Sequence, residues 1–224
     1  KNLNQSLTDL RIVTNTTNTE AAQIMNSYNS MGQNLGATTQ EIADSGIAWL
    51  RQGKSISEAN NLIEESTKLA KIGMLDNANA TKYLTSALNG YRLESEQASS
   101  VVDKLSKLDS AAAITAGGLA EGMSQTASTA NDLGISMDRL IGYLSTIGAT
   151  TQGSMSSIGQ ALKTIFSRMS NVKLGKVEFT DDDGTTESLS DVESTLSKLG
   201  IKLRENNNEF RDFGSVLDEV GLKW

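Results

Sequence analysis

Cysteine and histidine are absent from this chain of 224 residues. The chain therefore has no thiol nucleophile, no histidine for a Ser-His-Asp triad, and none of the Cys and His ligands of ordinary zinc sites. A disulfide framework is excluded too, so the stability of the fold must come from packing. The length is enough to bury a hydrophobic core, as one large domain or two small ones.

Proline is also absent, and aromatic residues make up only 4% of the chain. Because proline breaks helix interiors, its absence fits a mainly helical fold. The scarcity of aromatic rings argues against a surface on which unpaired bases stack. A formal net charge of −7 disfavours binding to phosphate backbones and is typical of an ordinary soluble surface. We therefore expect no specific binding of nucleic acid.

The longest stretch without charge, residues 140–162, is rich in Gly, Ser and Thr, so we do not expect it to span a membrane. No signal peptide is recognisable, and the first residues, KNLNQS, do not begin with methionine. We expect the chain to be a fragment of a longer protein.

Residues 134–169 carry the clearest helical pattern. Ser136 is suited to cap a helix, because its hydroxyl can accept a hydrogen bond from a first-turn amide. Two apolar stripes at helical spacing follow, separated by a polar turn at residues 150–153. They consist of Met137, Leu140, Ile141, Leu144 and Ile147, and then of Met155, Ile158, Leu162, Ile165, Phe166 and Met169. We expect this helix pair to be the centre around which the rest of the chain packs.

A glycine followed within a few residues by a serine occurs three times after residue 37 at the expected ends of helices. Each pair is interpreted as the stop of one helix and the cap of the next. The pairs are Gly53 with Ser57, Gly90 with Ser95, and Gly134 with Ser136. A further helix is expected to begin at Asn79. The serines are 38 and 41 residues apart, and a period near 40 indicates stacked helical hairpins, with chance similarity between hairpins as the alternative.

The two ends of the chain differ from this repeating part. Residues 1–36 are polar with thin helical stripes, and we interpret them as a linker or the end of a longer coiled segment, or alternatively as a terminal helix docked loosely on the core. Residues 37–171 are predicted to form a helical-hairpin core domain. Residues 172–224 are predicted to form a small α+β appendage, because the composition changes there.

The predicted appendage contains signals for both strands and helices. Asp183-Gly184 is a strong turn dipeptide for a β-hairpin. Ser190 with Glu193 forms a capping box that opens a helix. Two short strands around an Asn-rich turn and a final helix complete the tail. The predicted fold class is therefore mainly α, with stacked antiparallel helical hairpins and a small α+β C-terminal appendage.

Acidic residues are the main candidates for chemistry. A calcium loop of the EF-hand kind fails at Asp181–Asp183, because Phe179 would take its first position if Gly184 took the sixth. We expect these aspartates instead to be solvent-exposed residues of a turn. Two pairs could be the acid and base of a glycoside hydrolase, but we expect them on exposed faces or near helix caps, where no carboxyl pKa is raised. These pairs are Glu64 with Glu65 and Glu94 with Glu96.

Motifs for nucleophilic or phosphate chemistry are also missing. Residues 153–157, GSMSS, lack the second flanking glycine of a nucleophile elbow. No glycine-rich phosphate loop is followed by a lysine. We predict no catalytic, cofactor-binding or metal-binding residue, and we do not expect an enzyme.

The order of structural motifs points to a known family. An Ala-rich helix ends in Leu-Gly, then come a Ser and an acidic residue, a helix, a Gly-punctuated turn, and a last helix with a Leu-x-x-x-Phe pattern. These positions are Ala127, Ala130, Leu133, Gly134, Ser136, Asp138, Leu140, Gly148, Gly153, Leu162 and Phe166. The tail adds Leu199-Gly200-Ile201, Phe210, Phe213, Val216 and Leu217. Over about residues 40–220 the chain resembles the core domain of the tail tape measure proteins of long-tailed bacteriophages or prophages.

The resemblance implies a structural virion protein that sets tail length, scaffolds assembly of the tail tube and leaves ahead of the DNA. It implies as partners the tail tube and tail tip proteins, tail assembly chaperones and other copies of the chain, with contact to the host cell envelope during ejection. It places the protein in the lumen of the phage tail, and in the host cytoplasm during assembly. The alternative is a helical-repeat module that presents a groove to a peptide or protein, without catalysis.

Overall fold

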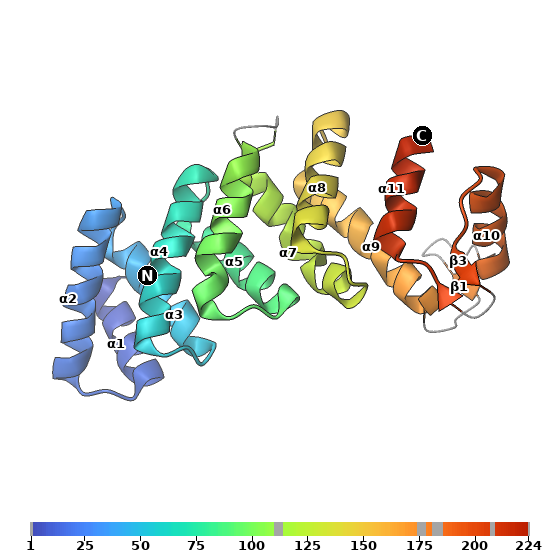
Figure 1. The fold of residues 1–224 in the computed structure, drawn as a ribbon. Coiled ribbons are helices and arrows are strands. Elements are labelled where there is room, and N and C mark those ends of the chain that lie inside the picture. The colour runs from blue at the N-terminus through green and yellow to red at the C-terminus, as the bar shows by residue number, and fades with distance from the viewer. Residues whose placement is uncertain (1, 110–113, 174–177, 181–185, 207–208, 224) are drawn as a thin grey trace.

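The computed structural model describes residues 2–109, 114–173, 178–180, 186–206 and 209–223, and within them most residues are helical (Figure 1). The first nine helices are α1 (Leu3–Thr14), α2 (Asn18–Leu35), α3 (Thr39–Arg51), α4 (Ile56–Ile72), α5 (Asn77–Tyr91), α6 (Ala98–Asp109), α7 (Ala116–Asp132), α8 (Met137–Thr151) and α9 (Met155–Lys173), with a 3-10 turn, η1 (Ser95–Gln97), before α6. The tail holds β1 (Glu178–Thr180), β2 (Thr186–Ser188), α10 (Leu189–Lys198), β3 (Arg204–Asn206), β4 (Glu209–Phe210) and α11 (Phe213–Lys223). The predicted mainly α fold is confirmed.

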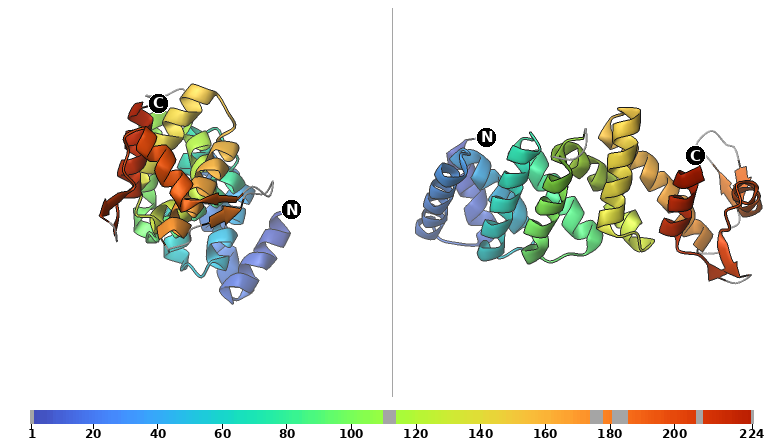
Figure 2. Two further views of the ribbon diagram at one scale, coloured as in Figure 1. Left: turned by 90° about the vertical axis from the view of Figure 1, so that its right-hand side faces the viewer. Right: turned by 45° about the horizontal axis from the view of Figure 1, so that its top comes forward.

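The helices build an elongated rod of two layers, which Figures 1 and 2 show from three directions. Helices α1, α3, α5, α7 and α9 contact one another in that order and form the first layer. Helices α2, α4, α6 and α8 do the same in the second layer. Helices α1, α3, α5 and α7 are each joined by a short connection to the second-layer helix that follows. This arrangement confirms the predicted stack of antiparallel hairpins.

Helix caps recur in step with the hairpins. In the second layer the N-caps of α2, α4, η1 and α8 are Thr17, Ser55, Glu94 and Ser136, which lie 38, 39 and 42 residues apart. At Ser55 the capping box is complete: the serine hydroxyl accepts a hydrogen bond from the Glu58 amide, and the Glu58 carboxylate accepts one from the Ser55 amide at 2.9 Å. The structure therefore has the predicted period near 40 and the predicted cap at Ser136.

Two of the predicted serine caps are wrong. Ser57 lies in the first turn of α4, because Ser55 has the glutamate three residues further on that closes a capping box. Ser95 lies inside η1, and its hydroxyl donates to Glu58 Oε1 at 3.0 Å, which joins the starts of two neighbouring second-layer helices.

Two predicted boundaries of α5 are wrong as well. The helix begins at Asn77 instead of Asn79, because the Asp76 carboxylate accepts a hydrogen bond from the Asn79 amide at 2.8 Å. It continues through Gly90 to Tyr91, and Arg92 takes the left-handed conformation with φ 54°. Gly90 is needed for packing instead, since a Cβ at that position would lie 2.5 Å from the Ala127 Cβ.

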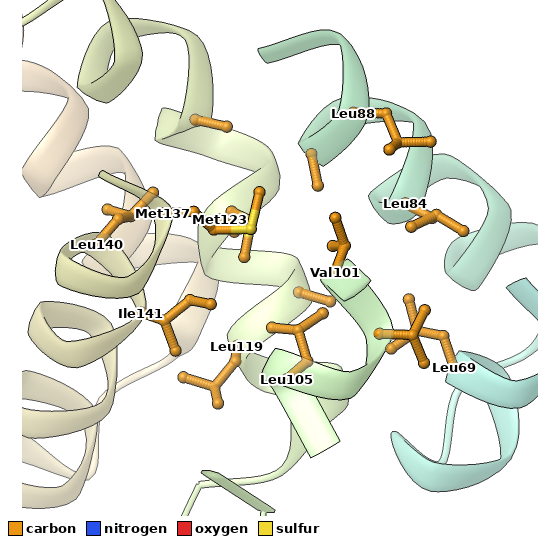
Figure 3. Close-up of a cluster of buried hydrophobic side chains, with 14 of the residues drawn as sticks. Leu69, Leu84, Leu88, Val101, Leu105, Leu119, Met123, Met137, Leu140 and Ile141 are labelled. Carbon is orange, nitrogen blue, oxygen red and sulfur yellow. The ribbon is translucent and has the colours of Figure 1, made fainter. Parts of the chain in front are cut away.

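A continuous hydrophobic core runs along the rod, and Figure 3 shows the part between α4 and α8. Its labelled side chains are Leu69, Leu84, Leu88, Val101, Leu105, Leu119, Met123, Met137, Leu140 and Ile141. The predicted stripe of α8 is largely confirmed, with Leu144 fully buried. The prediction for Ile165 is wrong: this side chain is 42% exposed, because α9 turns Leu162 and Phe166 inward and Ile165 lies off that face.

Helix α7, rather than the α8–α9 pair, is the centre of the stack. It packs along its length against α5 on one side and α9 on the other, more extensively than any other helix. Small residues permit this close approach, because a Cβ at Gly159 of α9 would lie 2.3 Å from the Gly122 carbonyl oxygen of α7. Residues 110–113, between α6 and α7, lie outside the described residues. Gly117 packs directly on Gly73.

Helices α1 and α2 pack on α3 at the first end of the rod. Leu10 and Tyr28 are fully buried, and the Tyr28 hydroxyl lies so near Gly46 that a Cβ there would be 2.5 Å away. Ser6 donates a hydrogen bond to Asp44 Oδ1 at 3.1 Å. The division of the chain into domains at residues 36 and 171 remains a proposal.

The tail contains two small antiparallel hairpins, β1–β2 and β3–β4, with α10 between them. The predicted hairpin after residue 172, the second strand pair and the final helix are present, while the Asp183-Gly184 turn lies outside the described residues. Helix α10 begins at Leu189, one residue before the predicted Ser190 cap. The Glu193 carboxylate accepts a hydrogen bond from Arg204 of β3.

Helix α11 returns to the rod and lies beside α8 (Figure 1). The Tyr143 hydroxyl is 2.8 Å from Asp218 Oδ1 and 3.1 Å from the Gly214 carbonyl oxygen, and Arg139 pairs with Asp212 at 3.0 Å. Burial and the hydrogen bond to Asp218 raise the pKa of Tyr143, so the hydroxyl stays protonated and able to donate. The segment between α9 and α11 is thus an insertion, after which the chain adds one more helix beside the second layer.

Candidate interaction surface

A surface groove lies between α3 and α5, which run parallel as neighbours in the first layer. Its volume is about 480 Å³. Helices α5 and α7, and α7 and α9, approach closely where Gly90 meets Ala127 and Gly122 meets Gly159. Helices α3 and α5 meet instead through two hydroxyls, because Thr81 Oγ1 donates to Ser45 Oγ at 3.0 Å. Because α3 and α5 pack less closely than the other neighbouring pairs of the first layer, a groove remains between them at the surface.

Small side chains form the floor of the groove and carboxylates form one end. Ser45 and Thr81 are 4% exposed, and Ala48 and Ala78 continue the floor. The full lining is Glu41, Asp44, Ser45, Ala48, Gln52, Asp76, Asn77, Ala78, Thr81, Lys82, Thr85 and Ser86. Three carboxylates and one ammonium make the groove acidic.

The carboxylates of the groove also hold local structure. Hydrogen bonds from the Thr38 amide and hydroxyl lower the pKa of Glu41, so this carboxylate is ionised at neutral pH. Asp44 accepts a hydrogen bond from Gln40 Nε2 at 2.8 Å, and Asp76 caps α5. Asp44 also accepts the hydrogen bond from Ser6 Oγ at 3.1 Å, so each of its two carboxylate oxygens already has a donor.

Asn77, the first residue of α5, lines the groove but is only 8% exposed. Within the described part of the chain, no hydrogen-bond partner faces its side-chain amide. Sequence reasoning missed this residue because it began the helix at Asn79 and left Asn77 in the connection. Asp76, one residue earlier, is the signal that would have found it, because aspartate is a preferred N-cap residue and its position places Asn77 first in the helix.

The acidic pairs considered from the sequence do not assemble into a site. Glu65 pairs with Lys68 at 2.6 Å, and Glu64 is exposed on the same helix. Glu94 is the N-cap residue of η1, and Glu96 is exposed within η1. Asp181–Asp183 lie outside the described residues. Among the residues that the structure describes, no three acidic side chains are placed to hold a metal ion together.

Residues 153–157 form the connection into α9. The Ser157 amide donates a hydrogen bond to Ser154 Oγ at 3.4 Å, so the Ser154 hydroxyl caps the start of α9. No helix in the described ranges is both long and apolar enough to cross a lipid bilayer.

Comparison with known proteins decides the family. The family model of the phage-related minor tail proteins matches residues 25–223, which is most of the chain. The chain belongs to this family. A structural role in a phage tail, as a component of the virion, follows from this membership. The match extends from α2 to α11, so it includes the groove, the closely packed helices α5, α7 and α9, and the C-terminal helix α11 that lies beside α8. No solved structure matches the chain.

Proposed function

We propose that this minor tail chain is a segment of a tape measure protein, which sets tail length, scaffolds the tail tube and is expelled ahead of the DNA. The family match over residues 25–223 is the observation that carries the proposal, and the order of motifs described above supports the finer assignment. The protein acts in the tail lumen and, during assembly, in the host cytoplasm. Its partners are tail tube and tail tip proteins, assembly chaperones and other copies of itself, and it contacts the host envelope during ejection. It performs no catalysis.

A ruler must be extended, and the two-layer rod is not its most extended form. A helix rises by about 1.5 Å per residue along its axis, whereas stacked hairpins advance by only about 10 Å for each pair of helices. Besides the hydrophobic core, small contacts between glycine backbones, as at Gly117 and Gly159, hold the rod together, and there is no disulfide. We infer that the isolated segment is a helical rod of modest stability and that in the phage tail it is remodelled into extended helices.

In-frame deletion of residues 37–171 from the phage gene tests this function. Extended helices predict tails shorter by about 200 Å, from about 1.5 Å for each deleted residue. A retained rod predicts shortening by only about 40 Å, for three hairpins and α9. Electron microscopy of the tails distinguishes these results. Tails of unchanged length would show that the segment is no part of the ruler.

The second candidate function is that of a helical-repeat binding module, which the α3–α5 groove favours. The two candidates differ in genomic setting, because a tape measure requires a very long reading frame beside genes for the tail tube and tail tip. A short gene without phage neighbours would favour the binding module. Unchanged tail length in the deletion experiment would favour it as well.

A further inference from the structure

The side chain of Asn77 points to a ligand in the α3–α5 groove. A primary amide carries two N–H donors and one carbonyl acceptor, and these are normally satisfied when the group is buried. At 8% exposure Asn77 is almost fully buried, yet the described structure gives its amide no partner. Its polar atoms are not fully enclosed, and the residue lines both this groove and a smaller neighbouring hollow. An amide in this position matches the donor and acceptor of a peptide main chain.

The charges of the groove indicate the side chains of that peptide. Glu41, Asp44 and Asp76 lie at the end of the groove next to Asn77, and Lys82 is the single cation among the lining residues. A phosphate backbone would meet like charge here. Lysine and arginine side chains would meet opposite charge, and arginine can pair with a carboxylate through two parallel hydrogen bonds.

The floor indicates how the peptide lies. Ala48, Ala78 and the hydroxyls of Ser45 and Thr81 leave room for a main chain or for the methylene stem of a lysine, but offer no deep apolar socket for a bulky hydrophobic side chain. From Glu41 to Gln52 the groove follows α3 for about 16 Å, at about 1.5 Å per residue. That length fits about five residues of an extended chain.

We propose that the α3–α5 groove binds a short, extended, cationic segment of another protein. Asn77 hydrogen-bonds its main chain, while Asp44 and Asp76 pair with its lysine or arginine side chains. This interaction goes beyond the tape measure function and does not depend on it, since the groove is built by α3 and α5 alone.

The test uses the 224-residue chain and two blocked hexapeptides, one of alternating Lys and Ala and one of alternating Glu and Ala, with affinities measured by isothermal titration calorimetry. We expect the lysine peptide to bind and the glutamate peptide not to bind. The double variant Asp44→Asn/Asp76→Asn should weaken binding at least tenfold. Asparagine keeps the cap at position 76, and at position 44 its oxygen can accept the hydrogen bond from Gln40 while its NH2 group donates to Ser6 Oγ, so the fold is retained.

A matched control removes the same charge elsewhere. Glu64→Gln/Glu96→Gln alters two exposed carboxylates outside the groove and should change the affinity less than twofold. Asn77→Ala should weaken binding several-fold without altering its salt dependence, because it removes a neutral contact. Ala48→Leu, which fills the floor, should block binding with every charge in place.

Equal loss in the two charge-neutralising double variants would mean that the peptide is held by overall charge, and would overturn the proposal. Failure of the lysine peptide to bind at millimolar concentration would overturn it too. Unaltered affinity in both Asn77→Ala and Ala48→Leu would place the peptide outside the groove. None of these results bears on tail length, so the deletion experiment remains a separate test of the proposed function.

Discussion

Gly117 of α7 packs on Gly73 at the end of α4 so closely that a Cβ on Gly117 would lie 2.2 Å from the Gly73 carbonyl oxygen. Real Cβ atoms do not approach an oxygen to that distance, so the two backbones touch only because both residues are glycine. The contact joins the second hairpin directly to the fourth. It shows that the rod is built from backbone contacts as well as from the apolar core.

Gly117→Ala is therefore expected to destabilise the chain. Overpacking of a close contact typically costs about 1–3 kcal/mol, because backbones must shift. The control is Gly142→Ala, since Gly142 lies inside α8 with nothing within 4 Å of an added Cβ. That change should stabilise by about 0.5–1 kcal/mol through the better helix propensity of alanine. Urea denaturation followed by circular dichroism measures both, and equal midpoints for the two variants would show that α4 and α7 do not touch.

Leu144 and Ile165 separate the buried and exposed faces of the α8–α9 pair. Leu144 is fully buried, so Leu144→Ala should lower the free energy of unfolding by about 2–5 kcal/mol. Ile165 is 42% exposed, so Ile165→Ala should change it by less than about 1 kcal/mol. Both variants delete aliphatic carbons from a helix, which makes each the control for the other. A larger loss at Ile165 than at Leu144 would contradict the orientation of α9.

The sequence was informative about the period and the class of element. The Ser136 cap, the stripes of α8 and the hairpins of the tail follow from local rules of capping, spacing and turns. Ser55 and Ser57 show where prediction from local rules fails. Both serines could cap α4, and only Glu58, three residues after Ser55, decides in favour of Ser55 because it completes a capping box.

Contacts between distant segments could not be predicted in this way. Gly90 looks like a helix stop in the sequence, but its position opposite Ala127 exists only after α5 and α7 have packed. The central role of α7 was missed for the same reason, since its small residues give a weak apolar stripe. The groove and the buried Asn77 depend on the spacing between α3 and α5, which no local pattern encodes.

The capping box at Ser55 should make stability depend on pH in acid. Hydrogen bonds from the Ser55 amide and hydroxyl, with one from Ser95, lower the pKa of Glu58 from 4.5 to about 2. The unfolded chain thus takes up the proton at higher pH than the folded chain does. The contribution of Glu58 is complete above about pH 5 and is lost as the pH falls toward 2. In Glu58→Gln this part of the pH dependence should vanish, and denaturation midpoints at pH 5, 4, 3 and 2.5 for both proteins measure it. Parallel midpoint curves would contradict an ionised Glu58 in the capping box.

Duplex DNA is not expected to bind the chain tightly at physiological salt. The chain carries 27 acidic and 20 basic side chains, and affinity for duplex DNA depends on lysine and arginine that neutralise phosphates. If the chain leaves the tail tube ahead of the DNA, as proposed above, it also gains nothing by holding phosphates. Fluorescence anisotropy with a labelled 20-base-pair duplex measures the affinity. A submicromolar dissociation constant with a steep salt dependence would refute this expectation.

Tyr143→Phe should loosen α11 from α8 and leave the rest of the rod in place. The hydroxyl is 2.8 Å from Asp218 and 3.1 Å from the Gly214 carbonyl oxygen, and its loss should cost about 1 kcal/mol, as for a typical net hydrogen bond. Amide hydrogen exchange should therefore quicken about fivefold across α11, while the amides of α7 keep their protection. The control is Tyr83→Phe, because in the described part of the chain no hydrogen bond is formed by the Tyr83 hydroxyl. If exchange in α11 and α7 quickened together, α11 would unfold only with the whole rod. If neither changed, Tyr143 would not hold α11, and the ion pairs of Arg139 with Asp212 and Asp218 would be the polar links that remain.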